Sequence, residues 1–562
     1  MSTFIGTNKI FGYRIASGND SLSNIGFDGT HAIESPTGRR SWQVKLFASP
    51  EAHLTIGLSD EKGFCAYVWG IPVHPKVGSA DIPSWCANIV AERHYNRFKE
   101  LLGPFVVIVD EPAQHRITIA TDIQGIRPIF LTKDNGRIVF GSDVWSIQKA
   151  GLINKAVDYD AVSAWITYGY NCTNGTLFAG LRRLPPGSVT VLQRNQCDEF
   201  RYAVFQAEGQ RASVKQAAAD LHQIVASTVK TLLENYPRVT LALSGGYDSR
   251  YLLALSSLFL REAVNCAVVS VSEEEITPAR QVAVALGASL DIIRVKGSEW
   301  DLYDQVYHFT PDGFPISKFV TYCMAQKYPA TPMINGFLGD SLMRGSHDRI
   351  HEKYETGYGD NLADVLQREH TIISPDVFRR DVVAKIEARS RLPMETAVRE
   401  GQRIGKVFNW ADLFYRQRFY ISNNFLQHIS LTEGLLPFYS WELLSYKMNH
   451  DNRVFSREIY DMIFAGHFAS IAKIPHASDL AQGKSQTPKP ARCTKRWARQ
   501  LLPKIANKNW LSLLAKRRSS LLAVAGMVNS SRFESSILTL QRLYLLEERA
   551  RSSAIDFDWE RL

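Results

Sequence analysis

The stretch Leu241-Ala242-Leu243-Ser244-Gly245-Gly246-Tyr247-Asp248-Ser249-Arg250 decides the fold that the sequence predicts. The apolar run at residues 239–243 is typical of a buried parallel strand. Ser-Gly-Gly then ends this run, and a new apolar series from Tyr251 onward indicates the opening of a helix. A strand, a glycine turn and a helix N-terminus in this order direct several backbone N–H groups to one point. The sequence therefore predicts an anion-binding turn in an α/β domain.

The side chains of this turn indicate which anion it suits. Gly245 and Gly246 allow a phosphate to approach the backbone, and Ser244 and Ser249 offer hydroxyl donors. Asp248 would repel a bare phosphate, so its presence indicates a bridging Mg²⁺. The G-x-x-x-x-G-K-[ST] spacing of the Walker loop is absent from the stretch. We therefore expect a phosphate and magnesium site of another kind.

Ser-Gly-Gly-x-Asp-Ser resembles the pyrophosphate loop of the ATP pyrophosphatases, which split ATP between its α and β phosphates. The resemblance implies ATP and Mg²⁺ as ligands. It also implies that the nucleotide and its metal are contacted by Leu243, Ser244, Gly245, Gly246, Asp248 and Ser249. The alternative is a tight strand–helix turn in an ordinary α/β domain.

The composition narrows the class of protein. At 562 residues the chain is long enough for two or more domains. Its 45% hydrophobic and 22% charged residues are typical of a soluble globular protein, without a signal-peptide pattern or an apolar run of membrane-spanning length. The seven cysteines form no C-x-x-C pair, which indicates free thiols in a reducing cytoplasm. The net charge of +9 is modest for this length and does not predict a nucleic-acid partner.

Residues 1–205 are predicted to form a first, β-rich domain. Turn signals separate four strand-like segments, at residues 66–70, 105–110, 116–122 and 137–142. Four segments resemble the glutaminase domain of asparagine synthetase and the segment that ends it, at residues 103–107, 122–130, 140–143 and 181–188. The resemblance implies an Ntn-hydrolase-like α/β/β/α fold.

The glutaminase chemistry of that domain is not kept in this sequence. In the family, a cysteine that follows the initiator methionine attacks the glutamine amide. Here position 2 is Ser2, and the nearest cysteine is Cys65. The family holds the oxyanion with an Asn-Gly pair, for which Trp69-Gly70 is the best local match. We therefore expect a scaffold domain that hydrolyses no glutamine.

Residues 206–480 are predicted to form a second domain around a parallel sheet. A helical pattern at residues 214–236 leads into the opening stretch. Apolar runs at residues 266–271 and 290–295, with a helical segment at residues 279–287 between them, complete a β-α-β-α-β series. Such a series implies parallel strands with right-handed crossovers.

A second segment carries the remaining expected contacts to the nucleotide. Residues 333–345 resemble the family's Ser-Gly-Glu-Gly-Ser-Asp-Glu segment, which a glycine pair follows. The resemblance implies backbone contacts to ATP at Val269 of the preceding strand and at Asn335 and Gly336. Asp340 falls on the family's second Mg²⁺ aspartate. The alternative for Asp340 is a helix N-cap.

The residues expected on the acceptor side differ from the family. Phe337 and Ser341 stand where the family has glutamates. The segment that begins at Glu433 resembles the family's Glu-x-Arg-x-Pro-Phe-Leu-Asp, so the resemblance implies a catalytic role for Glu433. The family's lysine, which stabilises charge on the reacting phosphate, has two candidates here, Lys473 and His476. The catalytic assignment is made to Lys473.

Three further segments complete the predicted organisation. Glutamates 273–275 are expected to form a solvated turn. Residues 345–430 have helical periodicity, and their aromatic and arginine face is typical of core packing. Residues 481–562 are predicted to be a basic helical extension. Its segment 495–518 favours a solvated helical face, and the alternative is an amphipathic contact with an anionic membrane or a peptide.

Together these features predict an asparagine-synthetase-like ligase. The resemblance implies that ATP and a carboxylate form an acyl-adenylate with release of pyrophosphate, and that an amine then gives the amide. The expected partners are ATP, Mg²⁺ and a carboxylate and amine substrate, either small molecules or a peptide. The alternatives are a macrolactam synthetase of the lasso-peptide kind and a nucleotide-binding scaffold without catalysis.

Overall fold

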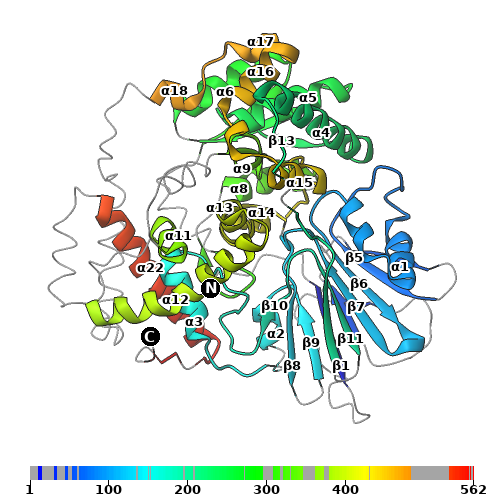
Figure 1. Ribbon diagram of the computed structural model, residues 1–562, viewed down its shortest axis with the longest axis vertical. Helices are drawn as coiled ribbons and strands as arrows, with labels where there is room; N and C mark the ends of the chain where they lie inside the picture. The colour runs from blue at the N-terminus through cyan, green and yellow to red at the C-terminus, as the bar shows by residue number, and fades with distance from the viewer. Residues whose placement is uncertain are drawn as a thin grey trace.

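The structure is a computed structural model of the chain. It describes residues 10–15, 31–33, 45–48, 54–481 and 531–561, apart from gaps at 60–62, 135–136, 194–195, 207–208, 295–307, 317–319, 346–360, 372–378 and 559–560 and the single residues 150, 152, 271, 330, 430 and 556. Two antiparallel sheets form the part up to Arg201, and a parallel sheet with its helices follows (Figure 1).

The two antiparallel sheets have six strands each. The first has the order β10-β8-β9-β1-β3-β2, with β1 (Ile10–Ile15), β2 (His31–Ile33), β3 (Lys45–Ala48), β8 (Phe130–Asp134), β9 (Arg137–Gly141) and β10 (Arg182–Arg183). The second has the order β12-β11-β7-β6-β5-β4, with β4 (Leu54–Leu58), β5 (Cys65–Trp69), β6 (Val106–Glu111), β7 (Arg116–Thr121), β11 (Ser188–Gln193) and β12 (Gln196–Arg201). The four strands predicted from the sequence correspond to β5, β6, β7 and β9.

The two sheets pack face to face. Alternate residues, such as Ile117 and Ile119 of β7 and Ile138 and Phe140 of β9, belong to one buried apolar cluster. Helix α1 (Ile82–Glu92) contacts strands of the second sheet, and α2 (Val144–Lys149) contacts β9 of the first. This arrangement confirms the predicted α/β/β/α fold class.

A parallel sheet of five strands has the order β15-β14-β13-β18-β19. Its strands are β13 (Thr240–Ala242), β14 (Asn265–Val269), β15 (Ser289–Ile293), β18 (Met333–Ile334) and β19 (Gly434–Leu435). Leu241 is in register with Cys266 on one side and with Ile334 on the other. The chain moves outward from β13 to β15 and then returns to β18 on the other side of β13. This reversal of strand order makes a topological switch point between β13 and β18, where α/β sheets bind ligands.

Helices cover both faces of the parallel sheet. Helices α5 (Tyr247–Phe259) and α6 (Glu273–Ala285) share one buried cluster with Leu241 and Cys266. Helix α8 (Val320–Lys327) shares a separate cluster with Ala267 and Met333. Because successive residues of a strand face opposite sides, the two clusters lie on opposite faces of the sheet. The predicted parallel α/β sheet is therefore confirmed.

The remaining elements complete the chain. They are η1 (Tyr95–Glu100), η2 (Pro112–Gln114), α3 (Tyr159–Tyr168), α4 (Val214–Asn235), β16 (His308–Phe309), β17 (Pro315–Ile316), α9 (Gly339–Met343), α11 (Leu362–His370), α12 (Arg380–Arg403), α13 (Val407–Ala411), the π-helix η3 (Asp412–Ile421), α14 (Asn423–His428), α15 (Trp441–Asn449), η4 (Asn452–Val454), α16 (Arg457–His467), α17 (Ala469–Ala472), α18 (Ala477–Ala481) and α22 (Ser531–Ser552).

Two expectations about helix starts are wrong. Glu273, Glu274 and Glu275 form the first turn of α6 rather than a solvated turn. Carboxylates in a first turn interact favourably with the positive end of the helix dipole, which explains why three glutamates begin a helix here. Helix α5 begins at Tyr247, because Gly246 in an extended conformation is its N-cap, and not near Tyr251.

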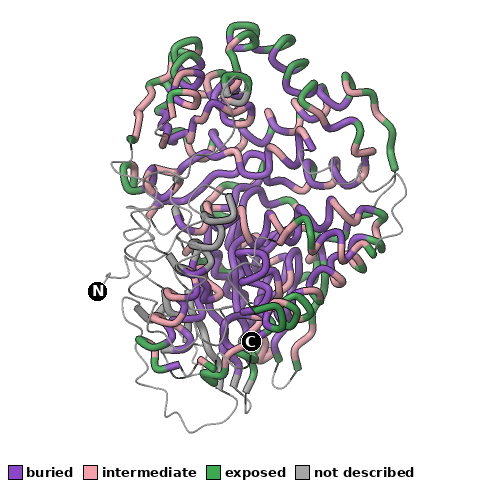
Figure 2. Tube along the Cα trace, turned by 90° about the vertical axis from the view of Figure 1, so that its left-hand side faces the viewer, coloured by how far each residue is buried: buried purple, intermediate pink, exposed green. Residues whose placement is uncertain are grey.

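The sandwich and the parallel sheet share one core. A single buried apolar cluster includes Phe64 of the sandwich part and Ile471 near the end of the second part. Hydrogen bonds cross between the parts, since the side-chain amide of Gln124 donates to the carbonyl of Leu413 at 2.9 Å. Figure 2 shows buried chain continuing from one part into the other. The second part is thus held against the first by side chains that exclude water.

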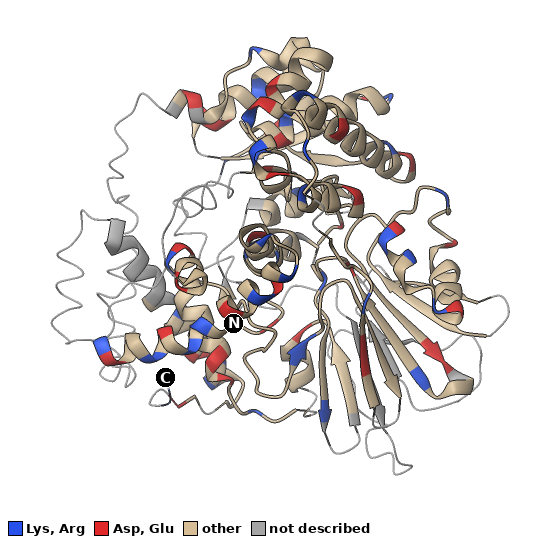
Figure 3. Ribbon diagram, in the orientation of Figure 1, with Lys and Arg blue, Asp and Glu red and all other residues tan. Residues whose placement is uncertain are grey.

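The surface and the C-terminal region bear on the expected partners. Basic and acidic residues are interspersed over the upper helices in Figure 3. Among the described residues, no helix is long and apolar enough to cross a membrane. The predicted basic segment 495–518 lies outside the described residues.

Two stacked histidines join α4 to α16. The rings of His222 and His467 lie 4.0 Å apart between centroids, and Nδ1 of His222 is 2.8 Å from the hydroxyl of Tyr251. Burial and, to a smaller extent, the neighbouring His467 lower the pKa of His222 from 6.5 to about 4. Protonation of this pair would place two positive charges in contact.

We expect the stability of the fold to decrease as the pH falls from about 6.5 toward 4. In that window the unfolded chain binds a proton at residue 222 that the folded chain excludes, so acid favours unfolding. His222→Gln should flatten the dependence of the urea midpoint on pH, whereas the exposed control His94→Gln should keep the wild-type slope. Equal slopes in His222→Gln and the wild type would contradict this assignment.

Candidate functional site

The predicted loop lies at the carboxyl end of β13, beside the switch point. The N–H of Ser244 donates to Oγ of Ser249 at 3.0 Å, and the N–H of Gly246 donates to Oγ of Ser244 at 3.1 Å. These bonds fold the loop tightly into the start of α5. Gly246 is the N-cap of α5 and supplies no side-chain cap. The first N–H groups of α5 are therefore left to an incoming acceptor, and the positive helix end suits an anion.

Leu243 and Val269 mark the carboxyl ends of the two adjacent strands. The N–H of Leu243 donates to the carbonyl of Ala267 at 2.9 Å, which extends the pairing one residue beyond β13. The side chain of Leu243 is buried, so only its backbone is available for contacts at the loop. The register of Ala242 with Ala267 places Val269 level with Ser244. Both residues thus lie beside the loop.

The segment after β18 meets the loop from the other side of the switch point. Oδ1 of Asn335 accepts the N–H of Phe337 at 2.9 Å and turns the chain. A Cβ on Gly336 would lie 3.0 Å from Cβ of Asp248, and a Cβ on Gly339 would lie 2.6 Å from Cγ of Asp248. Glycine at these two positions therefore allows the two loops to touch.

Leu338 adopts a backbone conformation that usually belongs to glycine. It is buried, caps the N-terminus of α9 and has a φ of 71°. A left-handed conformation costs a non-glycine residue about 1 kcal/mol or more. The turn places Asp340 in the first turn of α9, so Asp340 is not the N-cap of this helix.

These contacts bring Asp248 and Asp340 together. The hydroxyl of Tyr460 donates to Asp248 at 2.6 Å, and Arg344 forms an ion pair with Asp340. Burial raises the pKa of Asp248 to about 6, a rise that Arg344 and Tyr460 oppose and the charge of Asp340 increases. The two carboxylates are therefore close enough to interact.

The two carboxylates fit a magnesium ion. Mg²⁺ prefers oxygen donors and is commonly held by one or two carboxylates together with phosphate oxygens and water. In the part of the chain that the structure describes, no group of three or more His, Cys, Asp or Glu side chains could hold a metal ion. A metal at Asp248 and Asp340 would therefore need further oxygens from a ligand, which a nucleotide phosphate supplies.

The segment between α17 and α18 lies against the loop. The guanidinium of Arg250 donates to the carbonyls of Ile474 at 2.7 Å and Pro475 at 2.9 Å. The N–H of Ala477 donates to the carbonyl of Gly245 at 3.2 Å. Arg250, the last residue of the quoted stretch, thus fastens a segment more than two hundred positions away.

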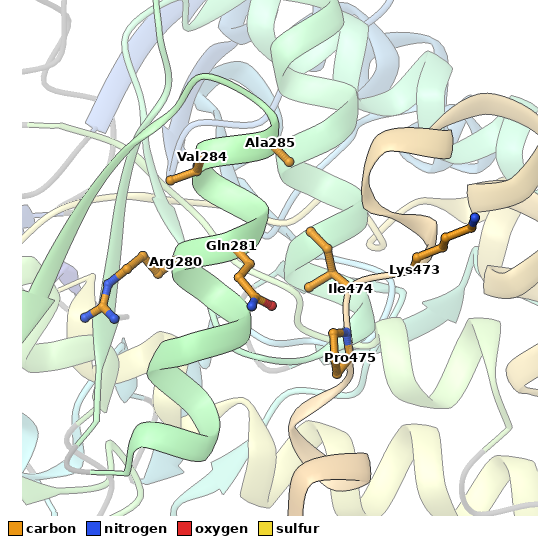
Figure 4. Close-up of a pocket in the computed structure, with 7 residues that line it drawn as sticks. All are labelled: Arg280, Gln281, Val284, Ala285, Lys473, Ile474 and Pro475. Atoms are coloured by element: carbon orange, nitrogen blue, oxygen red, sulfur yellow. The ribbon is translucent and has the colours of Figure 1, made fainter.

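The two candidates for a phosphate-facing cation, His476 and Lys473, lie differently. The ring of His476 stacks on that of Tyr247, with 4.2 Å between the ring centroids. Burial, and to a smaller extent the nearby Arg250, lowers the pKa of His476 to about 4, so the ring is neutral at pH 7. Lys473 is exposed and lies at an open cleft of about 530 Å³ between α6 and residues 473–475 (Figure 4). The cleft is lined by Arg280, Gln281, Val284, Ala285, Lys473, Ile474 and Pro475. The catalytic assignment of Lys473 stays a prediction.

Known proteins resemble this chain in sequence. The family model of the glutamine amidotransferase domain matches residues 88–203. Asparagine synthetase [glutamine-hydrolyzing] 3 of Bacillus subtilis (strain 168) is 26% identical over 158 residues, which cover 28% of this chain and 26% of that protein. Asparagine synthetase [glutamine-hydrolyzing] 1 of the same strain is 22% identical over 264 residues, which cover 45% of this chain and 41% of that protein.

The chain is thus similar in sequence to two asparagine synthetases and contains a segment that matches a glutamine amidotransferase domain. The matched segments span less than half the length of these two curated relatives. Among solved structures, the glutamine phosphoribosylpyrophosphate amidotransferase from B. subtilis complexed with ADP and GMP is 12% identical and covers 63% of this chain and 80% of that chain. Its TM-score of 0.23 is too low to support an argument about the fold.

Glu433, the predicted catalytic carboxylate, does not face the loop. Its side chain is 1% exposed and forms an ion pair with Arg127 of the sandwich, whose guanidinium lies 4.8 Å from the ring centroid of Trp69. The carbonyl of Glu433 accepts the N–H of Met333, the first residue of β18, so Glu433 precedes β19 and lies at the opposite end of the sheet from the loop. This geometry does not support the catalytic expectation, and the structure gives Glu433 a role in joining the two parts.

The two acceptor-side positions that lack glutamate are filled by other contacts. Phe337 is buried among apolar residues. Oγ of Ser341 accepts a hydrogen bond at 2.8 Å from the side-chain amide of Gln417, which comes from the π-helix η3. These two positions thus carry no carboxylate.

Two residues of the site were not predicted from the sequence. Arg344 follows Asp340 by four residues, the spacing of a helical ion pair, and this signal could have identified it. Tyr460 lies 212 positions after Asp248, so nothing local indicates their contact.

We expect Glu433→Gln to reduce the free energy of unfolding by about 3–5 kcal/mol, because it leaves Arg127 buried without its counter-charge. Urea unfolding measures this loss, and the exposed control Glu458→Gln should lose little. Adding Arg127→Met to Glu433→Gln should restore part of the stability. A Glu433→Gln variant of unchanged stability that had lost activity would instead support the catalytic assignment.

Proposed function

We propose that the protein uses ATP to activate a carboxylate as an acyl-adenylate and then forms an amide bond. The observation that carries this proposal is the meeting of two glycine-bearing loops at the switch point, where Asp248 and Asp340 lie beside an open helix N-terminus. Similarity to two asparagine synthetases supports the same reaction class. In this proposal residues 1–205 are the scaffold domain and residues 206–480 the ATP-binding domain.

Each residue of the loop has a definite task in this reaction. The N–H groups at the start of α5 and the hydroxyls of Ser244 and Ser249 hold the pyrophosphate. Val269, Asn335 and Gly336 provide backbone contacts to the nucleotide. A magnesium ion, when bound at Asp248 and Asp340, neutralises charge on the phosphates.

The bonds change in two steps. A carboxylate oxygen of the substrate attacks the α-phosphorus, and the bond to the bridging oxygen of the β-phosphate breaks to release pyrophosphate. The amine nitrogen then attacks the acyl carbon, AMP leaves with the bonding electron pair, and the nitrogen loses a proton. The first step needs neutralised phosphates, because an anion attacks an anion.

The amine in this proposal is free ammonia or part of the substrate. Ser2 lies outside the described residues, but the Trp69-Gly70 position that would hold an oxyanion is described. Arg127 covers Trp69, and a Cβ at Gly70 would lie 2.7 Å from Nε of Arg127. This packing favours a first domain without glutaminase activity. The partners are then ATP and a carboxylate and amine substrate, small molecules or a peptide, in the reducing cytoplasm that the free thiols favour.

A second candidate function is a nucleotide-binding scaffold without catalysis. The observation that favours it is the absence of carboxylates at two positions, since Phe337 is buried and Ser341 is hydrogen-bonded to Gln417. This candidate predicts ATP binding without turnover.

ATP–pyrophosphate exchange with a panel of carboxylates tests the proposal. We expect exchange with at least one acid, and Asp248→Asn should reduce it by about 10²–10³-fold, since several kcal/mol of charge stabilisation are lost. The matched control is Asp461→Asn, an exposed aspartate of α16 that should leave exchange unchanged.

The outcomes separate the two candidates. ATP binding without exchange for any carboxylate would support the scaffold. Exchange that is unaffected by Asp248→Asn would contradict the assignment of the loop.

A further inference from the structure

Arg344 is a cation of the site that neither the sequence motifs nor the family match assigns. It follows α9, and Arg344-Gly345 stands where the resembling family segment has its glycine pair. A long charged side chain thus replaces a hydrogen atom immediately beside the predicted metal ligands.

The side chain of Arg344 faces both loops. It forms an ion pair with Asp340 and interacts electrostatically with Asp248. Its guanidinium carbon lies 5.5 Å from the ring centroid of Tyr247, a residue of the pyrophosphate-type loop. Arg344 therefore spans the junction at which the phosphates are proposed to lie.

One donor of Arg344 has no acceptor within the described residues. Its Nε is buried and has no hydrogen-bond partner within the described residues, although 28% of the side chain is exposed. A buried donor without an acceptor costs about 1–3 kcal/mol, and a ligand oxygen at this position would remove that cost. The arginine fork matches the paired oxygens of a phosphate.

Three other cations of the described residues near the loop are placed differently. Arg250 donates to two backbone carbonyls of the segment between α17 and α18. Arg457 contacts the same tyrosine ring at 5.1 Å but is ion-paired with Asp479. Lys473 lies at the outer cleft. Arg344 is therefore the cation best placed to reach a ligand at the loop.

We propose that Arg344 binds a phosphate group of ATP and supplies the positive charge that Lys473 was expected to supply. This inference rests on the proposed function. With no nucleotide bound, Arg344 is the counter-ion of Asp340. On nucleotide binding its fork turns to phosphate oxygens, which gives Nε–H an acceptor and leaves the oxygens of Asp340 to a metal.

Calorimetric titration with ATP in the presence of EDTA tests the direct contact without a metal. We expect Arg344→Gln to weaken ATP binding by about 10- to 100-fold, the loss of one charge-assisted contact, and to leave adenosine binding unchanged. Arg344→Lys keeps the charge but loses the fork, so its affinity for ATP should lie between those of the wild type and Arg344→Gln. The control Arg457→Gln should bind ATP as the wild type does, and circular dichroism checks the fold of each variant.

A charge-balanced double variant distinguishes a phosphate contact from a counter-ion. Asp340→Asn/Arg344→Gln has the same net charge around the loops as the wild type. If Arg344 contacts phosphate, this double variant binds ATP in EDTA more weakly than the wild type. If it binds ATP as well as the wild type, Arg344 is a counter-ion of Asp340 and the inference is overturned.

Failure of the proposed function gives a different result. A wild-type protein that binds no ATP, with or without Mg²⁺, would sink the proposed function itself. A wild-type protein that binds ATP while Arg344→Gln binds it equally well would overturn the role of Arg344 and leave the loop assignment standing.

Discussion

The close approach of Gly336 and Gly339 to Asp248 is the constraint on which the rest of the site depends. There is no room for a side chain at either glycine, since a Cβ would lie 3.0 Å or less from the aspartate. Because β13 and β18 are adjacent at the switch point, their following loops must meet, and glycine allows them to meet at backbone distance. The carboxylates, the open helix end and Arg344 all take their positions from this contact.

The two parts of the chain are joined just before β19, at the end of the parallel sheet opposite the loop. The pair of Arg127 and Glu433 is fully buried, and the guanidinium also contacts Trp69, where a glutaminase would need an oxyanion site. A buried ion pair adds little net stability but is costly to break, so it fixes one arrangement of the two parts rather than strengthening the fold. This packing makes the Trp69 position part of the contact between the two parts.

Much of the fold could be predicted from the sequence, because alternating and continuous apolar runs are local signals. Strands β5 to β7, β13 to β15 and helix α4 follow from such runs. The α6 start was missed because three glutamates indicate solvent exposure, whereas the helix dipole favours them there. The roles of Glu433 and Lys473 came from alignment alone, which does not report which side chains are buried. Tyr460 is brought to the site by long-range packing of α16, which no local pattern encodes.

Leu338 shows where the site and the stability of the chain conflict. A buried leucine holds a left-handed turn directly before Asp340, although glycine would adopt this turn without strain. Packing against its neighbours must supply the roughly 1 kcal/mol that the conformation requires, and the same packing removes freedom from the carboxylate that follows. A glycine here would remove the backbone strain but would also give this turn more conformational freedom. The protein therefore loses a small part of its fold stability and gains a fixed direction for the carboxylate of Asp340. A substitution at Leu338 that raised thermal stability would remove this fixed direction.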